Sequence, residues 1–208
     1  MIRLFKYLFL AVLSIPTLVH PMWISSFGGS LNPEYANAPI TQICNAARAG
    51  NVDAVKRLIK HVDLDELDPV SGTTVLMKAS DGGHSEIVKM LLDAGANTNR
   101  RDAGGWSPLR HVIRQGDQQV IKMLIERGAD VNYKSYQETL LMSAAEVGNA
   151  GSVQQLIDAL ADLYPVCADG KSALVYASEN DNLTACTLLI VDAMLRPAQE
   201  QKTDFIHF

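Results

Sequence analysis

The stretch GHSEIVKMLLDAGANTN, from Gly83 to Asn99, returns about one unit later as GDQQVIKMLIERGADVN, from Gly116 to Asn132. Apolar residues and glycines fall at matching offsets in the two copies. Similarity of a chain to itself at a fixed spacing is typical of repeat proteins, in which each copy is one supersecondary unit. The sequence therefore predicts an array of similar units.

Three columns of residues extend this repeat along the chain. Glycines recur at spacings of 33, 33 and 32 residues, and an aspartate takes the next place: Gly50, Gly83, Gly116, Gly148 and Asp181. Two leucine columns keep the same spacings: Leu58, Leu91, Leu124, Leu156 and Leu189, and Leu76, Leu109, Leu141 and Leu174. Because the three columns share one register, coincidence is excluded and the units span most of the chain.

Each unit reads as two short helices followed by a polar turn. A hydroxyl residue that can cap a helix stands before a short apolar run in four units: Thr74, Ser107, Thr139 and Ser172. Pro108 takes the first helical position, where its missing N–H does no harm. A second helix follows, and Gly95 and Gly128 are placed to end it in the left-handed conformation. A helix pair this small buries its apolar face only by stacking on a neighbour.

These motifs resemble those of ankyrin-repeat proteins. They are Gly72–Leu76 with Gly83–Leu92 and Gly95–Asn97, Gly105–Leu109 with Gly116–Asp117 and Gly128–Asn132, and Thr139–Leu141 with Ala144–Ala145 and Gly148–Asn149. The resemblance implies an all-α ankyrin-repeat solenoid of stacked helix-turn-helix units with exposed β-turn fingers. Its array would cover residues 39–194, with units at about 40–70, 71–103, 104–136, 137–168 and 169–194, and a tail at 195–208.

Two departures from the family pattern carry expectations of their own. Ankyrin repeats commonly have a histidine after Thr-Pro-Leu, and that place holds Met77, Arg110, Met142 and Val175. The hydrogen bonds of that histidine must then come from elsewhere or be lost. Leu160 stands where Gly95 and Gly128 stand in earlier units, so we expect its turn to be shaped differently, aided by Pro165. The first and last units read as caps.

The amino terminus has the layout of a secretory signal. Arg3 and Lys6 precede an apolar run from Tyr7 to Val19, which is a positive n-region followed by an h-region. The sequence therefore predicts export, with the bacterial periplasm as the favoured location. An ordinary buried helix would not show two cations at its start and no polar stripe after them.

Cleavage of this signal is a separate question. Pro16 interrupts the apolar run, and the two small-x-small sites, Ser26–Gly28 and Ala36–Ala38, lie far from it. An uncleaved membrane tether through residues 7–27 is the alternative, because roughly 20 uncharged residues can cross a bilayer. In either case we expect residues 1–38 to be signal or anchor plus linker.

The sequence shows no site for chemistry. The chain of 208 residues has a formal net charge of −5, which argues against nucleic acid as a partner. None of its histidines lies in a metal-binding pattern such as H-E-x-x-H, and the acidic stretch Asp63–Pro69 lacks the ligand order of a calcium loop. The three cysteines have no zinc-ligand spacing. We therefore expect no enzyme activity, no cofactor and no metal.

The remaining candidate is a protein-binding surface. In ankyrin proteins the finger tips and the exposed side of the first helices form a concave binding face. Trp, Tyr and Arg are the residues most often found as interface anchors. The predicted partner-binding residues are Arg101, Trp106, Arg110, Arg114, Tyr133 and Tyr136. The competing interpretation is that Trp106 packs on its own turn and that the arginines form a solvated face.

The predicted function is a non-enzymatic protein–protein interaction module, exported or tethered to a membrane. An exported inhibitor, or a protective factor for a specific enzyme or stress response, is the alternative. The sequence names neither the partner nor the oligomeric state.

Overall fold

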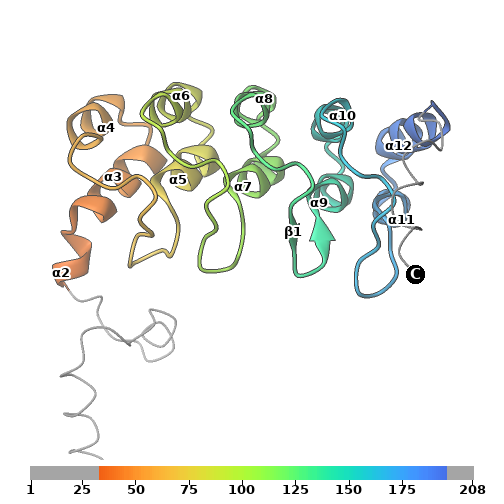
Figure 1. Ribbon diagram of the computed structural model, residues 1–208, viewed down its shortest axis with the longest axis horizontal. Coiled ribbons are helices and arrows are strands. Elements are labelled where there is room, and N and C mark those ends of the chain that lie inside the picture. Colours follow the sequence, from red (N-terminus) through yellow and green to blue (C-terminus); the bar gives the residue numbers. More distant parts are fainter. Residues whose placement is uncertain (1–32, 196–208) are drawn as a thin grey trace, which may run out of the picture.

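The computed structural model describes residues 33–195, in which five helix pairs stand side by side in one row (Figure 1). After α2 (Pro33–Ala36), the pairs are α3 (Pro39–Arg48) with α4 (Val52–Leu58), α5 (Val75–Asp81) with α6 (Ser85–Asp93), α7 (Pro108–Gln115) with α8 (Gln118–Glu126), α9 (Leu140–Val147) with α10 (Ala150–Asp158), and α11 (Ala173–Glu179) with α12 (Leu183–Leu195). The first helices form the inner row, next to the fingers, and the second helices form the outer row. The predicted all-α solenoid is confirmed.

The predicted helix starts are confirmed at three of the four hydroxyl residues. The side chains of Thr74, Ser107 and Thr139 each accept a hydrogen bond from the backbone N–H three residues later. Ser172 makes no such bond. The thioether sulfurs of Met77 and Met142 accept hydrogen bonds from the backbone N–H of Thr74 and Thr139, each at 3.4 Å. Methionine thus supplies a weak substitute for the family histidine in two units.

The turn at Leu160 corrects one expectation. Gly95 and Gly128 have φ of 91° and 82°, as predicted, but Leu160 has φ of 61° and keeps the same turn. Its N–H donates to the carbonyl of Ile157 at 2.9 Å, as Gly128 does three residues back in its own unit. The side chain of Leu160 is 72% exposed, so the left-handed backbone directs it into solvent and not into the core.

The core is continuous through the stack. Each inner helix packs on the next one, and Leu109, Ile113 and Leu141 are fully buried between them. Side chains at the finger bases link neighbouring units: Asn99 Oδ1 accepts from the N–H of Asp130 at 2.8 Å, and one unit later Asn132 Oδ1 accepts from the N–H of Asp162 at 2.8 Å. Apolar burial drives the stacking, and these bonds set the register of the fingers.

The third finger is a small β-hairpin. Strand β1 (Lys134–Ser135) pairs antiparallel with β2 (Glu138–Thr139), and the turn consists of Tyr136 and Gln137. Both turn residues have positive φ, 50° and 67°, which is the backbone of a type I′ turn. Such turns prefer Asn-Gly, so the sequence Tyr136-Gln137 strains this finger tip.

Two predicted segments lie outside the described residues. The signal or tether at residues 7–27 and the tail from residue 196 onward are not among them. Within residues 33–195 the structure has no helix with the length and hydropathy needed to cross a bilayer. The three cysteines, Cys44, Cys167 and Cys186, are free thiols.

Candidate functional site

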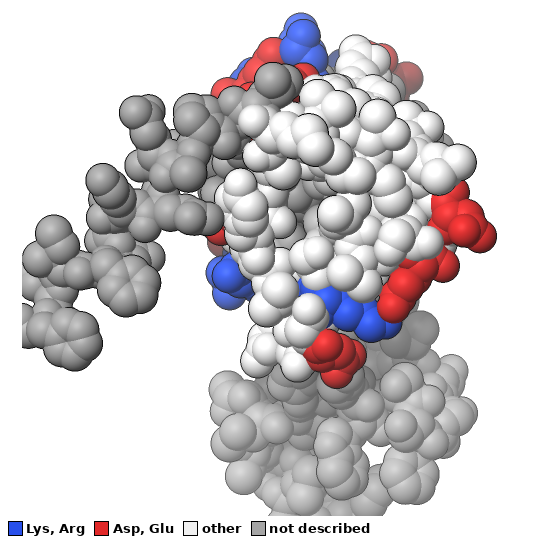
Figure 2. All heavy atoms as spheres, turned by 90° about the vertical axis from the view of Figure 1, so that its right-hand side faces the viewer, with Lys and Arg blue, Asp and Glu red and all other residues white. Residues whose placement is uncertain are grey.

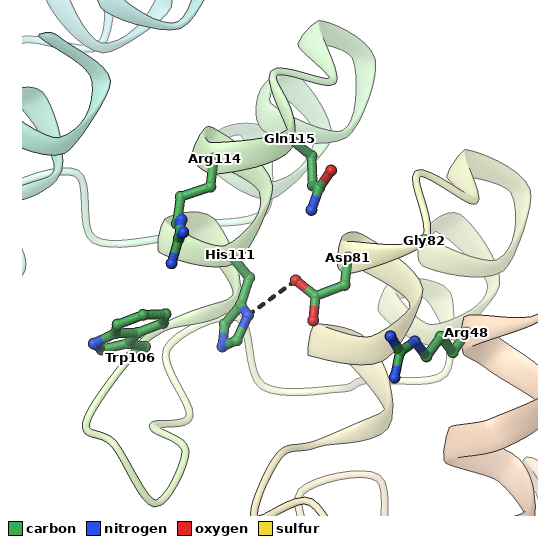
Figure 3. A pocket seen from close by; sticks show the side chains of 7 residues that line it. All are labelled: Arg48, Asp81, Gly82, Trp106, His111, Arg114 and Gln115. Carbon is green, nitrogen blue, oxygen red and sulfur yellow. Dashed lines mark hydrogen bonds and ion pairs between the residues drawn. The ribbon is translucent and has the colours of Figure 1, made fainter. Parts of the chain in front are cut away.

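A hollow of about 460 Å³ opens between the inner helices α3, α5 and α7 (Figure 3). Its lining residues are Arg48, Asp81, Gly82, Trp106, His111, Arg114 and Gln115. Arg48 comes from the end of α3, Asp81 from the end of α5, and Arg114 from α7, while Trp106 precedes α7 on the finger. Three successive units therefore contribute to one site.

His111 joins two of these units at the floor of the hollow. Its Nδ1 lies 3.0 Å from Oδ1 of Asp81, and its Nε2 lies 2.8 Å from Oδ2 of Asp102. Burial alone would lower the pKa of His111, but the hydrogen bonds and charges of the two carboxylates raise that pKa to about 9. His111 is therefore an imidazolium at neutral pH and donates from both nitrogens.

Asp102 ties this histidine to the finger. Its Oδ1 accepts hydrogen bonds from the backbone N–H groups of Gly104 and Trp106, each at 2.8 Å. Burial would raise the pKa of Asp102, but the bond from His111 and these backbone bonds outweigh it, so the pKa lies below its usual value. The carboxylate is thus ionised, and it fixes the backbone that carries Trp106.

Trp106 is half-buried and enclosed by cations. The guanidinium carbon of Arg110 lies 5.1 Å from the ring centroid and that of Arg114 lies 5.6 Å from it. The ring of His111 meets Trp106 edge-on at 5.6 Å. Arg110 also donates from Nη2 to Oε2 of Glu138 at 2.8 Å, which anchors it to the next finger. These contacts hold the indole in one orientation.

The structure corrects the exposure expected of two predicted residues. Arg110 is only 8% exposed and Tyr133 only 5% exposed, so both lie beneath the surface. Arg110 packs against the ring of Trp106. Tyr133 packs against Arg101, whose guanidinium carbon lies 4.5 Å from the Tyr133 ring centroid. Arg110 lies on α7 and pairs with Glu138 of the third finger, and Tyr133 lies at the base of that finger beside Arg101, so contacts with neighbouring units accompany the burial of both.

The other four predicted residues are accessible. Trp106 is half-buried, Arg101 and Arg114 are exposed, and Tyr136 is 82% exposed at the tip of the third finger. The structure brings Trp106, Arg110 and Arg114 together at the hollow. Arg101 belongs to the finger surface, on the ring of Tyr133.

Sequence reasoning missed Arg48 and His111. A signal for Arg48 existed, because Arg48, Asp81 and Arg114 are each 33 residues apart and occupy the same place on successive inner helices. His111 carried no such signal. Its two carboxylates lie 30 and 9 residues away, and only the fold brings them to its two ring nitrogens.

The described residues contain no group of three or more His, Cys, Asp or Glu side chains arranged to hold a metal ion. Asp81, His111 and Asp102 form a charge-linked row rather than a ligand cage, since both histidine nitrogens are already directed at carboxylates. The arrangement can recognise charge and present an aromatic surface.

The C-terminal end of the stack has a different chemistry. Seen end-on, this face is mostly uncharged, with acidic and basic groups near its rim (Figure 2). Leu174, Leu183, Ile190 and Met194 are exposed there, Met194 by 79%. Terminal repeats of solenoids usually carry a polar outer face, and the exposed apolar side chains of this unit differ from that pattern.

Comparison with known proteins agrees with this architecture. Residues 43–135 match the family described as ankyrin repeats (3 copies). The ankyrin repeat and KH domain-containing protein mask-1 of Caenorhabditis elegans is 31% identical over 155 residues, which are 74% of this chain and 6% of that protein. The 26S proteasome non-ATPase regulatory subunit 10 of Mus musculus is 39% identical over 67 residues, 32% of this chain and 29% of that protein.

A third relative is the RelA-associated inhibitor of Mus musculus, 35% identical over 71 residues, which are 34% of this chain and 9% of that protein. The chain thus spans less than a third of the length of each of these relatives. The matched repeats and the stacked helix pairs together identify the described chain as an ankyrin-repeat solenoid.

Proposed function

We propose that this chain is a non-enzymatic module that binds a partner protein on the exposed side of its inner row and fingers. The observation that carries the proposal is Trp106, a half-buried indole held in place by Asp102, Arg110 and Arg114 at the mouth of a hollow. Ankyrin arrays typically bind proteins, and the surface chemistry of this one fits that role.

A fixed aromatic side chain is a good anchor for a partner. Trp and Arg are enriched among the residues that dominate binding energy. A side chain already ordered in the free protein loses little conformational entropy on binding. Because Trp106 is held by hydrogen bonds to its backbone and by cations on its ring, this entropy is lost at folding and not at association.

The third finger supports the same role. Tyr136 is exposed at the tip of a strained turn, with φ of 50°. Strained backbone concentrates at functional positions, where another residue would fold better but perform worse. We therefore place Tyr136 at the edge of the binding surface, one finger beyond Trp106.

We further propose that the array is exported, or held at a membrane by residues 7–27. The support is the order of charged and apolar residues at the amino terminus. Sequencing the amino terminus of the protein purified from its own cells, after fractionation, tests this. A start between residues 20 and 40 in the periplasmic fraction supports cleavage. Intact Met1 in the membrane fraction supports the tether, and intact Met1 in the cytosol contradicts both.

The binding function is tested by crosslinking in the native cells and identifying the captured proteins by mass spectrometry. The wild-type chain is compared with Trp106→Ala and with Lys89→Ala, a control on the exposed side of α6 in the outer row. We expect one dominant partner that is lost in Trp106→Ala and kept in Lys89→Ala. Equal capture by all three chains would contradict binding through this surface.

The identity of the partner then distinguishes two roles. If it is an enzyme, an equimolar amount of this chain either inhibits it or does not. Inhibition would favour the role of exported inhibitor, for which the name of the mouse RelA-associated inhibitor offers a parallel over about a third of the chain. Unchanged activity would favour a scaffold.

A further inference from the structure

Arg48 and Arg114 are two cations that line the same hollow. Both are exposed, and neither forms an ion pair with a carboxylate among residues 33–195. Arg110 and Arg127 do have such partners, Glu138 and Asp93. In Figure 3, Arg48 and Arg114 lie on opposite sides of the pair formed by Asp81 and His111. Two guanidinium groups thus face one hollow without a counter-charge of their own.

Asp81, the carboxylate that lines the hollow with these arginines, is already hydrogen-bonded to His111. Oδ1 of Asp81 accepts from His111, and Asp102 accepts from the other ring nitrogen. With His111 protonated, the three cations Arg48, Arg114 and His111 exceed the two carboxylates by one positive charge. A local excess of positive charge raises the concentration of anions at the hollow. One incoming negative charge would balance it.

Trp106 lies beside the guanidinium of Arg114, where an incoming negative charge would bind. The guanidinium carbon of Arg114 lies 5.6 Å from the centroid of the indole. Among residues 33–195 the Arg114 side chain has no ion pair, and the N–H edge of a guanidinium matches the two oxygens of a carboxylate. The indole offers an apolar wall beside it, which suits an aliphatic or aromatic neighbour of the acidic residue.

The charge pattern along the inner row excludes a longer anion. Arg48, Asp81 and Arg114 share their place on the inner helices with Glu146 and Glu179 in the last two units. A nucleic-acid backbone laid along this row would meet those carboxylates and be repelled. An acidic group of the partner is favoured over the first three units, where the arginines lie. The glutamates of the last two units would repel a second acidic group, so the charges also fix the direction in which the partner lies.

We propose that the hollow between Arg48 and Arg114 receives an Asp or Glu side chain from an acidic segment of the partner protein. The inference rests on the proposed function and names the chemistry that the partner brings. The carboxylate accepts hydrogen bonds from the guanidinium of Arg114, the charge of Arg48 across the hollow adds to the attraction, and the adjoining residue of the partner packs on Trp106. The rest of the partner runs toward the fourth and fifth units, where its charge is neutral or positive.

The test uses a phage-displayed library of random linear peptides, selected on the full chain. Selected peptides are labelled, and their affinities are measured by fluorescence anisotropy against wild type, Arg48→Glu, Arg114→Glu, Trp106→Ala and Arg57→Glu. Arg57 is an exposed arginine of α4 in the outer row, without an ion pair among residues 33–195, and serves as the matched control. Thermal melting checks the fold of every variant.

We expect acidic peptides that lose at least about tenfold in affinity on either hollow reversal and keep it with Arg57→Glu. Replacing the critical peptide Glu by Lys should abolish binding to wild type, and Arg114→Glu should restore part of it. Higher salt should weaken binding to wild type. This pattern supports a carboxylate between the arginines.

Three results would overturn the inference. The first is the enrichment of no acidic peptide. The second is peptides that need Trp106 but tolerate both arginine reversals, which would leave the proposed binding surface standing. The third is a single-stranded oligonucleotide that binds with the same arginine dependence, which would assign the hollow to phosphate. Peptides indifferent to Trp106 and to both arginines would contradict the proposed surface itself.

Discussion

His111 of α7 donates a hydrogen bond across 3.0 Å to Asp81 of α5, and this contact joins two neighbouring repeats. In a solenoid each unit contacts only its neighbours, so the stability of the array depends on such interfaces. This interface is ionic as well as apolar, which makes it sensitive to pH. The same side chain forms the floor of the proposed binding hollow.

The first prediction concerns pH. The pKa of His111 is raised from 6.5 to about 9 in the folded chain, so its contribution to stability is fully present below pH 6.5 and is lost as pH rises through 9. The shift corresponds to an effect on the order of 3 kcal/mol. Urea unfolding between pH 6 and pH 10 should show the free energy of unfolding falling in wild type and falling less in His111→Gln. Parallel curves would contradict it.

Asp102, the carboxylate at Nε2 of His111, makes stability depend on pH in the opposite direction. The pKa of Asp102 is lowered in the folded chain, so its contribution is present above its unfolded pKa and is lost as the pH falls through the folded value. Asp102→Asn should reduce the loss of stability at acid pH and lower stability at neutral pH, because His111 loses a partner. An unaltered acid unfolding curve would remove Asp102 from this account.

The second prediction concerns the turn at Leu160. Leu160 has φ of 61° in a turn where the equivalent residue of an earlier unit is Gly128. Left-handed backbone costs a residue with a side chain about 1 kcal/mol, so Leu160→Gly should raise the free energy of unfolding by up to that amount. Thermal melting checks this, and Gly128→Leu is the reciprocal control, which should lower stability. A lower melting temperature for Leu160→Gly would show that the added freedom of glycine in the unfolded chain outweighs the relief of left-handed strain at this turn.

The third prediction separates stability from function at the third finger. Replacing Tyr136 and Gln137 with Asn and Gly gives the turn the residues that a type I′ hairpin prefers, so melting temperature should rise. Affinity for the captured partner should fall, because the exposed ring of Tyr136 is lost. Binding measured alongside melting checks both. Affinity that is kept in the double variant would take Tyr136 out of the binding surface.

The fourth prediction distinguishes two reasons for glycine. Gly95 has φ of 91°, and no atom lies within 4 Å of the place that a Cβ would take, so Gly95→Ala meets backbone strain alone. Gly82 has an ordinary φ, but a Cβ there would lie 2.5 Å from the ring of His84. Both substitutions should destabilise the array by about 1 kcal/mol or more. Truncating His84 to Ala should relieve part of the cost at Gly82 and none of the cost at Gly95, as a double-mutant cycle would show.

Local patterns in the sequence predicted the repeat, the helix pairs and most of their ends. The hydroxyl caps at Thr74 and Thr139 and the left-handed glycines at Gly95 and Gly128 are properties of a few consecutive residues. The prediction at Leu160 was wrong because hydrogen bonds of the turn, closed by the backbone of Leu156 and Ile157, outweigh the preference of leucine for negative φ.

The site was less visible to sequence reasoning. Trp106 and Arg114 were selected for their residue type, and the structure places them together at the hollow. The same criterion also selected Tyr133 and Arg110, which are buried. Residue type alone does not report exposure, because exposure on an inner helix or at a finger base depends on what the neighbouring unit places against it.

By itself the sequence determined a stack of ankyrin-type units, since a spacing of 33 residues, caps and helix-ending glycines are each encoded locally and agree with one another. Tertiary structure alone decided which charges meet. Asp81, Asp102 and His111 lie in different elements, and Arg48 and Arg114 face one hollow only because stacking brings equivalent positions of successive units side by side. Charge pairing depends on distance in space, and distance in space between repeats is set by the packing of their apolar faces.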